Sequence, residues 1–373
     1  MIVESSRVNE RSWNGALKDA GNDSTIYQST FWADYAREVI GDHPIYLSST
    51  DKKGNINGLL LAIQSCYCRY PALTERSMRG IMFGKLYEIA LGPVFDRILP
   101  YVLWQNGPVV LQKSLLDNHS LEEIYSDLIE SILNIAEARK VYAIKFARPS
   151  YFTDCAELMS SSGFEKRRMG TILVDVEPSI ESLWRSIDRS ARRNISKIEQ
   201  DVTVAEVTKL VELRDFYDLY VQSTKRLNTK TYPFSHFESL WNFFSPLGKM
   251  VAFTAFIKDK PIGASISLTH NDMIHEYAYA DSDYTRSNRI YVIDTLKWHI
   301  MKWAHDRNFR YFDLSGIEFY KIDAGDEKAC NIFRFKSKWG GEVVEFHDYK
   351  RTFHVRGTKL LSLFLTEGEG FHT

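Results

Sequence analysis

Cysteine is scarce in this sequence, which has four cysteines among 373 residues, at positions 66, 68, 155 and 330. Zinc sites need several ligands at short, repeated spacings, and these cysteines do not supply them. We expect the cysteines to be reduced and structural, and we predict no metal site and no bound cofactor.

Long apolar runs are also missing. No segment approaches the roughly 18 apolar residues that span a bilayer. The first residues, Met1–Arg7, do not show the basic-then-apolar pattern of a secretion signal. We therefore expect a cytoplasmic protein without a transmembrane segment.

Neither sign of charge is in excess, because 47 lysines and arginines stand against 48 aspartates and glutamates. Without an overall positive field, nucleic acid could be bound only through a local basic patch. The hydrophobic share of 44% and the charged share of 25% are those of a globular chain. The length favours two domains over one.

A weak internal repeat indicates how these domains are built. Ser131–Arg139 aligns without gaps on His299–Arg307, and the alignment continues into the residues that follow each segment. Each copy has the pattern of an amphipathic helix that runs directly into a strand. A hairpin precedes each helix, at residues 51–64 and 251–269. We predict an α/β protein with two tandem domains of one type, each a mixed sheet flanked by helices.

The predicted domain boundary falls where a strand gives way to serines that can cap a helix. The first domain is expected to comprise residues 1–178 and the second residues 179–345. Residues 346–373 form a tail, in which a helix over 349–364 is expected to pack back on the first domain.

Residues 183–200 have the pattern of one helix with a basic face and an apolar face. The densest basic cluster of the chain lies here and consists of Arg185, Arg189, Arg192, Arg193 and Lys197. Such a face is either simply solvated or a binding surface for phosphate groups. The sequence leaves both interpretations open.

Two segments near the C-terminus carry the most informative pattern. Phe335–Glu342 is predicted to be a short amphipathic helix closed by Gly340-Gly341, with Lys336 near its end. About 20 residues earlier, Tyr311–Ile317 is predicted to be the end of a strand followed by a sharp turn, with Asp313 at the junction.

Together these segments resemble the C-terminal signature of the Fem-type (FemAB/FemX-like) peptidoglycan aminoacyltransferases, which are relatives of the GNAT acetyltransferases. Further segments resemble motifs of the same family in the same order, namely Gln28–Trp32, Asn106–Val110, Phe216–Arg226 and Tyr277–Tyr284. The resemblance covers about residues 26–345 and implies two tandem GNAT-like domains.

The resemblance also implies roles for individual residues. Lys336 matches the family's catalytic-site lysine, and Asp313 and Tyr279 are candidates for orienting the amine or passing a proton. The residues expected to bind substrate are Arg226, Arg37, Tyr277, Trp32 and Phe335. Those expected to bind tRNA phosphates are Arg189, Arg192, Arg193 and Lys197. Family members that bind a UDP-linked precursor carry a lysine four residues after the early tryptophan, where this chain has Ala36 with Arg37 beside it.

The expected chemistry is the attack of an amine on an ester or thioester carbonyl. A fixed cation can stabilise the developing oxyanion by about 2.7–4 kcal/mol, and Lys336 is the candidate, although it can also serve only the helix dipole. Asp313 can equally be a turn residue. On alternation along the strand, we expect only one of Tyr277 and Tyr279 to face the cleft. The sequence shows no nucleophile motif, so we expect direct transfer without a covalent enzyme intermediate.

A missing glycine-rich loop bears on the acyl donor. Enzymes that use acetyl-CoA hold its pyrophosphate with backbone N–H groups of such a loop at the start of a helix. Residues 283–292, which precede the second repeat helix, contain no glycine. The resemblance implies aminoacyl-tRNA as the donor instead.

We therefore expect an acyltransferase that moves an amino acid from aminoacyl-tRNA to an amine of a peptidoglycan or other cell-envelope precursor, either nucleotide- or lipid-linked. Two alternatives stay open. One is an acyl-CoA-dependent N-acyltransferase acting on an amino sugar or polysaccharide precursor. The other is a non-catalytic binding module, against which the presence of Lys336 and Arg226 argues.

Overall fold

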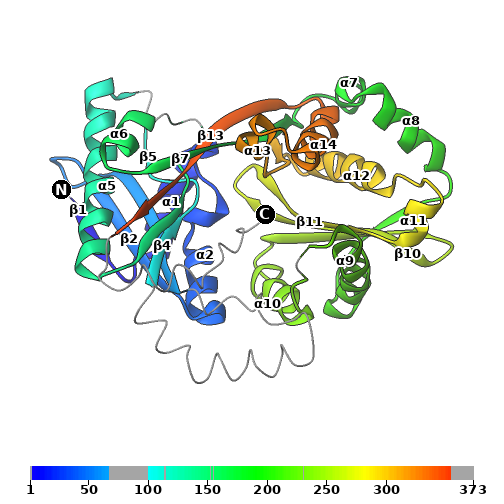
Figure 1. Ribbon diagram of the computed structural model, residues 1–373, viewed down its shortest axis with the longest axis horizontal. Helices are drawn as coiled ribbons and strands as arrows, with labels where there is room; N and C mark the ends of the chain where they lie inside the picture. Colours follow the sequence, from blue (N-terminus) through cyan, green and yellow to red (C-terminus); the bar gives the residue numbers. More distant parts are fainter. Residues whose placement is uncertain are drawn as a thin grey trace. The chain divides into compact units, whose positions relative to one another are not determined.

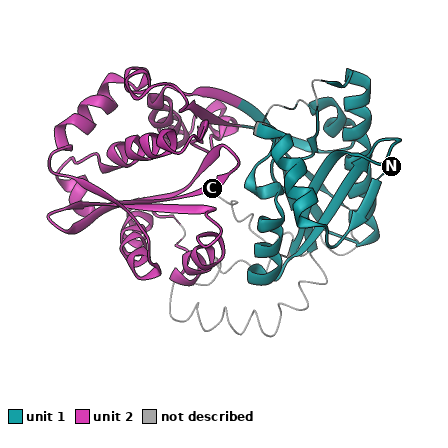
Figure 2. Ribbon diagram, turned by 180° about the vertical axis from the view of Figure 1, so that it is seen from behind, with its two compact units in different colours: residues 1–169, 345–372 teal, residues 170–344, 373 magenta. Residues whose placement is uncertain are grey.

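The computed structural model describes residues 2–66, 100–112, 115–229 except 152 and 154, and 231–353. The chain divides into two compact units (Figure 2): Met1–Met169 with Glu345–His372 form the first, and Gly170–Val344 form the second. Two strands, β7 (Glu165–Asp175) and β13 (Glu342–Thr352), run from one unit into the other. The predicted domain limits after residues 178 and 345 fall just beyond β7 and inside β13.

The first unit contains a mixed sheet in the order β1-β2-β3-β4-β6-β13, with β5 paired to β3. Its other strands are β1 (Ile2–Ser5), β2 (His43–Thr50), β3 (Ile56–Cys66), β4 (Pro100–Trp104), β5 (Val109–Val110) and β6 (Ala143–Ala147). β4 and β6 run parallel, whereas β6 and β13 run antiparallel.

Helices cover both faces of this sheet (Figure 1). α5 (Asn118–Ala138) packs against one face, and α1 (Glu10–Asp19) and α2 (Thr30–Tyr35) pack against the other. The apolar run Leu59–Ile63 in β3 alternates between the two cores, because a strand buried on both faces needs apolar residues at every position. The remaining helical segments described are two 3₁₀ turns, Gly21–Asp23 and Ile26–Gln28, the π-helical turn Ala36–Ile40, and α6 (Ala156–Ser161).

The second unit contains a sheet in the order β7-β12-β11-β10-β9-β8. Its other strands are β8 (Thr203–Glu206), β9 (Met250–Ile257), β10 (Lys260–His270), β11 (Met273–Asp281) and β12 (Tyr311–Asp313). β11 and β12 run parallel, and the other neighbours in this order run antiparallel.

Helices also sandwich the second sheet (Figure 1). On one side lie α7, α8 and α12, which share a core with the sheet, and on the other lie α9 and α10. The helices are α7 (Ile180–Ser186), α8 (Arg189–Ile198), α9 (Leu213–Leu227), α10 (Phe234–Phe244), α11 (Asp283–Ser287), α12 (Val292–Asp306), α13 (Phe319–Asp323) and α14 (Glu327–Lys336).

The predicted repeat is present in the two units. α5 leads into β6 in the first, and α12 leads into β12 in the second. The β2–β3 and β9–β10 hairpins precede these helices, as predicted. In the part of the chain that the structure describes, no helix is both long enough and apolar enough to cross a membrane.

Residues 183–200 do not form the single helix that their periodicity predicts. α7 ends at Ser186, and the chain is extended at Ile187 before α8 begins. The backbone N–H of Asp188 donates to Lys338 O (2.8 Å) instead of continuing a helix, and its carboxylate caps α8 through Ser190 N at 2.7 Å. A strong N-cap and a tertiary backbone bond therefore interrupt the amphipathic pattern.

The predicted helix over residues 349–364 is also corrected where the structure describes it. Tyr349–Thr352 are the end of β13 and pair with β6 of the first unit. Tyr349 is 2% exposed and joins the core beneath α5, so the chain returns to the first unit as a strand. Residues 354–364 of that predicted helix lie outside the described residues.

The predicted Gly-Gly cap is confirmed. α14 runs into a 3₁₀ turn, Ser337–Trp339, which Gly340 ends with a left-handed φ of 71°. A Cβ at Gly340 would lie 2.7 Å from Ser186 O, and one at Gly341 would lie 2.6 Å from Leu173 O. Both contacts are with backbone, so only glycine lets the chain pass here.

Candidate active site

The predicted catalytic residues lie where two strands of the second unit diverge. β11 and β12 pair only from Met273 and Tyr311 to His275 and Asp313. β11 continues to Asp281, whereas β12 ends in a turn in which Ser315 and Gly316 have φ values of 55° and 43°. This confirms the predicted strand end and sharp turn.

Lys336 holds that turn. Its Nζ donates to Leu314 O at 2.6 Å, to Ser315 O, and to Gly316 O at 3.4 Å. Burial lowers the pKa of Lys336, and the charges of Glu276 and Asp313 oppose that effect. The ammonium is thus a fixed cation at the end of β12, bound to three successive carbonyls.

Asp313 is enclosed. It is 1% exposed, and its Oδ1 accepts from Ser315 N at 2.8 Å and from the Thr171 hydroxyl. Its Oδ2 lies 2.9 Å from His275 Nδ1. Ser315 N lies in the turn, whereas Thr171 and His275 lie on β7 and β11, so Asp313 ties the loop that Lys336 binds to the neighbouring strands.

Tyr277 and Tyr279 point to opposite faces of the sheet, but for a different reason than predicted. Residues two apart on a regular strand share a face. The pairing of β10 with β11 shifts by one residue between Ile266 and Ser267. Tyr277 is the extra residue of β11 at this bulge. The bulge turns Tyr277 toward His236 of α10 and Tyr279 toward α12.

A buried ion pair that the sequence analysis missed lies under Tyr279. Lys297 of α12 is 0% exposed, and its Nζ binds Glu276. The same Nζ lies 4.3 Å from the centre of the Tyr279 ring and 5.8 Å from that of Phe335. Burial lowers the pKa of Lys297, and the Glu276 carboxylate opposes that shift. Glu276, Lys297 and Lys336 therefore form one group of interacting charges.

The helical pattern of α12 contained a signal for this lysine. Lys297 stands three, four and seven residues before Ile300, Met301 and Ala304, which are all 0% exposed. A charged residue within such an apolar stripe must be paired when the helix packs. The sequence contains no comparable signal for Glu276, because only the fold shows that Lys297 is its partner.

The remaining substrate-binding candidates are held by ion pairs or ring contacts. In the second unit, Arg226 of α9 binds Asp281 and, at 2.6 Å, Asp283. In the first unit, Arg37 binds Asp34 at 2.6 Å, and the Trp32 ring lies 4.8 Å from Tyr27. A phosphate reaching either arginine would compete with carboxylates already in place.

The basic candidates on α8 are largely exposed. Arg189, Arg193 and Lys197 follow at four-residue intervals and are exposed, whereas Arg192 is half-buried. Within the described residues none of the four forms an ion pair, so their charges are open to an anionic ligand. The opposite face of α8 buries Ala191, Ile195 and Ile198, as predicted.

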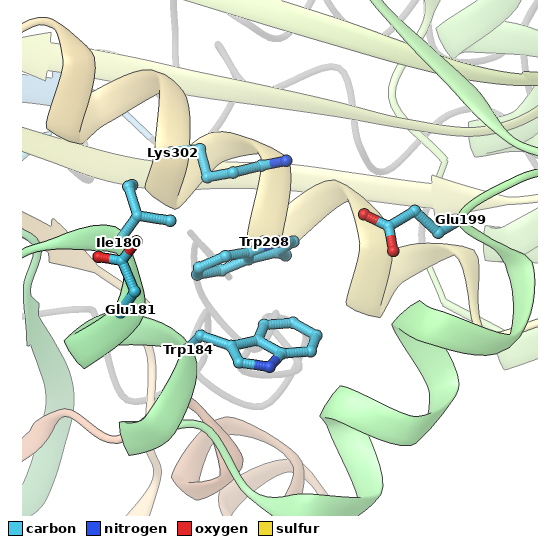
Figure 3. Close-up of a pocket in the computed structure, with 6 residues that line it drawn as sticks. All are labelled: Ile180, Glu181, Trp184, Glu199, Trp298 and Lys302. Atoms are coloured by element: carbon cyan, nitrogen blue, oxygen red, sulfur yellow. The ribbon is translucent and has the colours of Figure 1, made fainter.

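A surface groove of about 430 Å³ lies beside these helices (Figure 3). Its walls include Trp184 and Trp298, whose ring centres are 5.0 Å apart, with Glu181 and Glu199 at the margins. Lys302 Nζ lies 5.7 Å from the Trp298 ring. None of these residues belongs to the predicted site.

His236 makes the fold of the second unit acid-sensitive. Burial lowers its pKa to about 4, and its Nε2 lies 2.8 Å from the Tyr277 hydroxyl. A folded-state pKa below the ordinary value of about 6.5 means that the unfolded chain binds more protons between these values. Stability is therefore lost as the pH falls from about 6.5 to about 4.

We expect His236→Gln to reduce this loss by up to about 3 kcal/mol. The measurement is urea unfolding of both proteins at pH 7.5 and pH 4. His43→Gln, at the exposed start of β2, is the control and should behave as the unmodified protein. An equal loss of stability in all three proteins would contradict the assignment.

Comparisons with known proteins agree with this geometry. Residues 185–351 match the family model of the acetyltransferase (GNAT) domain. The chain contains a GNAT acyltransferase domain. This domain covers α8 to β13, including the diverging strands and both lysines, and it confirms the predicted acyltransferase class. A search of proteins with curated functions finds no match in sequence.

Solved structures show that the GNAT-like fold is present in both units. FemX is similar with a TM-score of 0.68 and 14% identity, covering 97% of this chain and 99% of FemX. A tandem GNAT protein from the clavulanic acid biosynthesis pathway is similar with a TM-score of 0.53 and 8% identity, covering 94% of this chain and 98% of that protein. L-PGS from Bacillus licheniformis is similar with a TM-score of 0.50 and 11% identity, covering 96% of this chain and 95% of L-PGS. The predicted FemX-like tandem GNAT fold is thus confirmed.

Proposed function

We propose that this chain transfers an aminoacyl group from aminoacyl-tRNA to an amine of a peptidoglycan or other cell-envelope precursor. The amine attacks the ester carbonyl directly, without a covalent enzyme intermediate. The acceptor class rests on the ordered Fem-type motifs of the sequence together with the FemX fold.

The segment before α12 carries the donor assignment. In a CoA-binding loop the backbone N–H groups face the pyrophosphate. Here the N–H groups of Asn288, Arg289 and Ile290 donate to Tyr284 O, Arg286 O and Thr285 O at 3.1, 3.3 and 2.8 Å. Donors already used inside the chain cannot cradle a pyrophosphate, and this supports a donor other than acyl-CoA.

The basic face of α8 supplies the phosphate contacts that a tRNA donor requires. Contacts to phosphates position a nucleic acid without reading its sequence. Exposed cations in a chain of net charge −1 suit this limited role. We assign Arg189, Arg192, Arg193 and Lys197 to the tRNA backbone.

Lys336 supplies the fixed positive charge at the reaction centre. The N–H groups of Lys336 are bound to three carbonyls, so its ammonium would stabilise an oxyanion near the end of β12 through its charge and not through a hydrogen bond. Asp313 keeps that turn in place, and Tyr279 lines the site on the side of α12. Arg226, Arg37, Tyr277, Trp32 and Phe335 stay predictions for acceptor binding.

An acyl-CoA-dependent N-acyltransferase acting on an amino sugar or polysaccharide precursor is the second candidate. The match to an acetyltransferase domain favours it. A non-catalytic binding module is the outcome that remains if neither donor binds.

Binding of a charged tRNA pool and of acetyl-CoA should be compared at 50 and 200 mM salt. We expect tRNA binding that weakens with salt, and Arg192→Ala/Arg193→Ala should reduce the log–log salt slope by about 1.4–1.8. Lys52→Ala/Lys53→Ala, at an exposed turn of the first unit, is the matched control and should not change it. Saturable acetyl-CoA binding without tRNA affinity would overturn the donor assignment.

A further inference from the structure

The groove in Figure 3 uses a different face of α12 from the proposed reaction centre. Trp298 directly follows Lys297 along the helix, but successive residues of an α-helix are turned by about 100°. Lys297 therefore reaches Glu276 of β11, whereas Trp298 packs against Trp184 of α7. The proposed transfer leaves this face of α12 without a role.

The most enclosed part of the groove is aromatic and apolar. Trp298 is 6% exposed, and Trp184 and Ile180 are half-buried against the core of the second unit. The two indole rings are in direct contact, with centres 5.0 Å apart and planes inclined by 51°. A ligand would therefore meet the outer faces and edges of the rings. These three side chains offer ring faces and C–H groups but no hydrogen-bond acceptor.

Charged side chains stand at the margins of the groove, and their charges are not balanced. Glu181 and Glu199 are exposed, and within the described residues neither forms an ion pair or a side-chain hydrogen bond. Among the described lining residues, only Lys302 is a cation, and its Nζ lies 5.7 Å from the centre of the Trp298 ring. In the same part of the chain, no cation lies over the ring of Trp184. The lining thus has room for one more positive charge.

These features favour a cation that carries no N–H group. Tryptophan faces attract cations within about 6 Å of the ring centre, and Lys302 already has this position on Trp298. A primary ammonium has three donors and is strongly hydrated, and the enclosed part of the groove has no acceptor for it. A quaternary ammonium has an apolar surface and needs only the rings and the field of the carboxylates.

We infer that this groove binds a quaternary ammonium ion, which places its alkyl groups on Trp184 and is attracted by Glu181 and Glu199. Lys302 competes with it, because like charges repel. The ion can arrive as a free solute or as the headgroup of a lipid, and its chemistry is the same in both. The inference goes beyond the proposed aminoacyl transfer. Its test does not use that reaction, so either can fail without the other.

The probe is choline, titrated calorimetrically into the full chain at low ionic strength. Its control is the neutral analogue of choline in which a carbon atom replaces the nitrogen, so that the shape is kept and the charge is lost. We expect saturable binding of choline and no comparable binding of the analogue. Trp184→Leu should weaken choline binding by about 2- to 30-fold, the range of a cation–ring contact.

Two changes of charge should act in opposite directions. Glu181→Gln/Glu199→Gln should weaken choline binding by about 2- to 30-fold, whereas Lys302→Met should strengthen it by up to about fivefold. Glu122→Gln/Glu123→Gln, exposed near the start of α5 in the first unit, is the matched control and should not change it. Partial unfolding lowers the number of binding sites in any variant and cannot strengthen binding, so the opposite signs separate charge from stability.

Vesicles of phosphatidylcholine distinguish the two sources of the ion. Cosedimentation of the unmodified protein that Trp184→Leu abolishes would identify a lipid headgroup, and choline binding without cosedimentation would identify a free ligand. Equal binding of choline and its neutral analogue would show a merely apolar groove and overturn the inference. Absence of saturable choline binding, or weaker binding in Lys302→Met, would overturn it as well.

Discussion

Replacing Lys336 with methionine should lower kcat/KM for acyl transfer by about 100- to 1000-fold, the range found when one oxyanion-stabilising group is removed. Methionine retains most of the side-chain volume but removes the only charge of that side chain. The three carbonyls of Leu314, Ser315 and Gly316 would also lose their shared donor. The assay follows product formation from the donor that the unmodified protein accepts, with hydroxylamine as the acceptor.

A structural role for Lys336 would give a different pattern from a catalytic one. Lys328→Met, at the exposed start of the same helix, controls for loss of a lysine from α14 and should retain full activity. Lys336→Arg keeps the charge and should recover part of the lost rate. If Lys336→Met lowers the melting temperature but leaves the activity of the folded fraction intact, the lysine serves only to hold the turn.

Replacing Asp348 with asparagine should destabilise the first unit by about 3–5 kcal/mol, the usual cost of breaking a buried ion pair by removing one partner. Arg148 Nε donates to Asp348 Oδ1 at 2.7 Å, and the two side chains are 12% and 11% exposed. Burial alone would lower the pKa of Arg148, but the Asp348 carboxylate outweighs it and the pKa lies above its ordinary value. The neutral amide of the variant would leave that guanidinium buried without a counter-charge.

The same strand offers the control for this prediction. Glu345 of β13 pairs with Arg168 at 2.7 Å, with side chains that are 48% and 41% exposed. Glu345→Gln should change the free energy of unfolding by less than about 1 kcal/mol, because solvent screens exposed pairs. Urea unfolding of the two variants measures the difference. Equal effects would show that burial does not set the strength of the Arg148–Asp348 pair.

Much of the fold was predictable because it depends on local patterns. The apolar spacing around Leu128 and Leu296 identified the two repeat helices, and both residues are 0% exposed. Gly340 was predicted as a helix cap because few other residues adopt a left-handed φ. The order of motifs then gave a GNAT-related acyltransferase, which the domain match confirms.

The errors arose where a tertiary contact overrides a local pattern. Residues 183–200 have a continuous helical periodicity, but the chain breaks at Asp188, whose N–H bonds to Lys338 O from a distant segment. Tyr349 belongs to a strand and not to the predicted helix, because it pairs beside β6. A sequence pattern does not show where a partner from a distant segment of the chain will lie.

The sequence by itself determined the class of protein, the paired α/β units and the position of Lys336, because periodicity, capping glycines and motif order are properties of the chain alone. Only the tertiary structure placed Glu276 beside Lys297 and Arg148 beside Asp348. The bulge that separates Tyr277 from Tyr279 likewise exists only against β10. Each of these pairings depends on strand register and helix packing, which bring together residues that no local pattern connects.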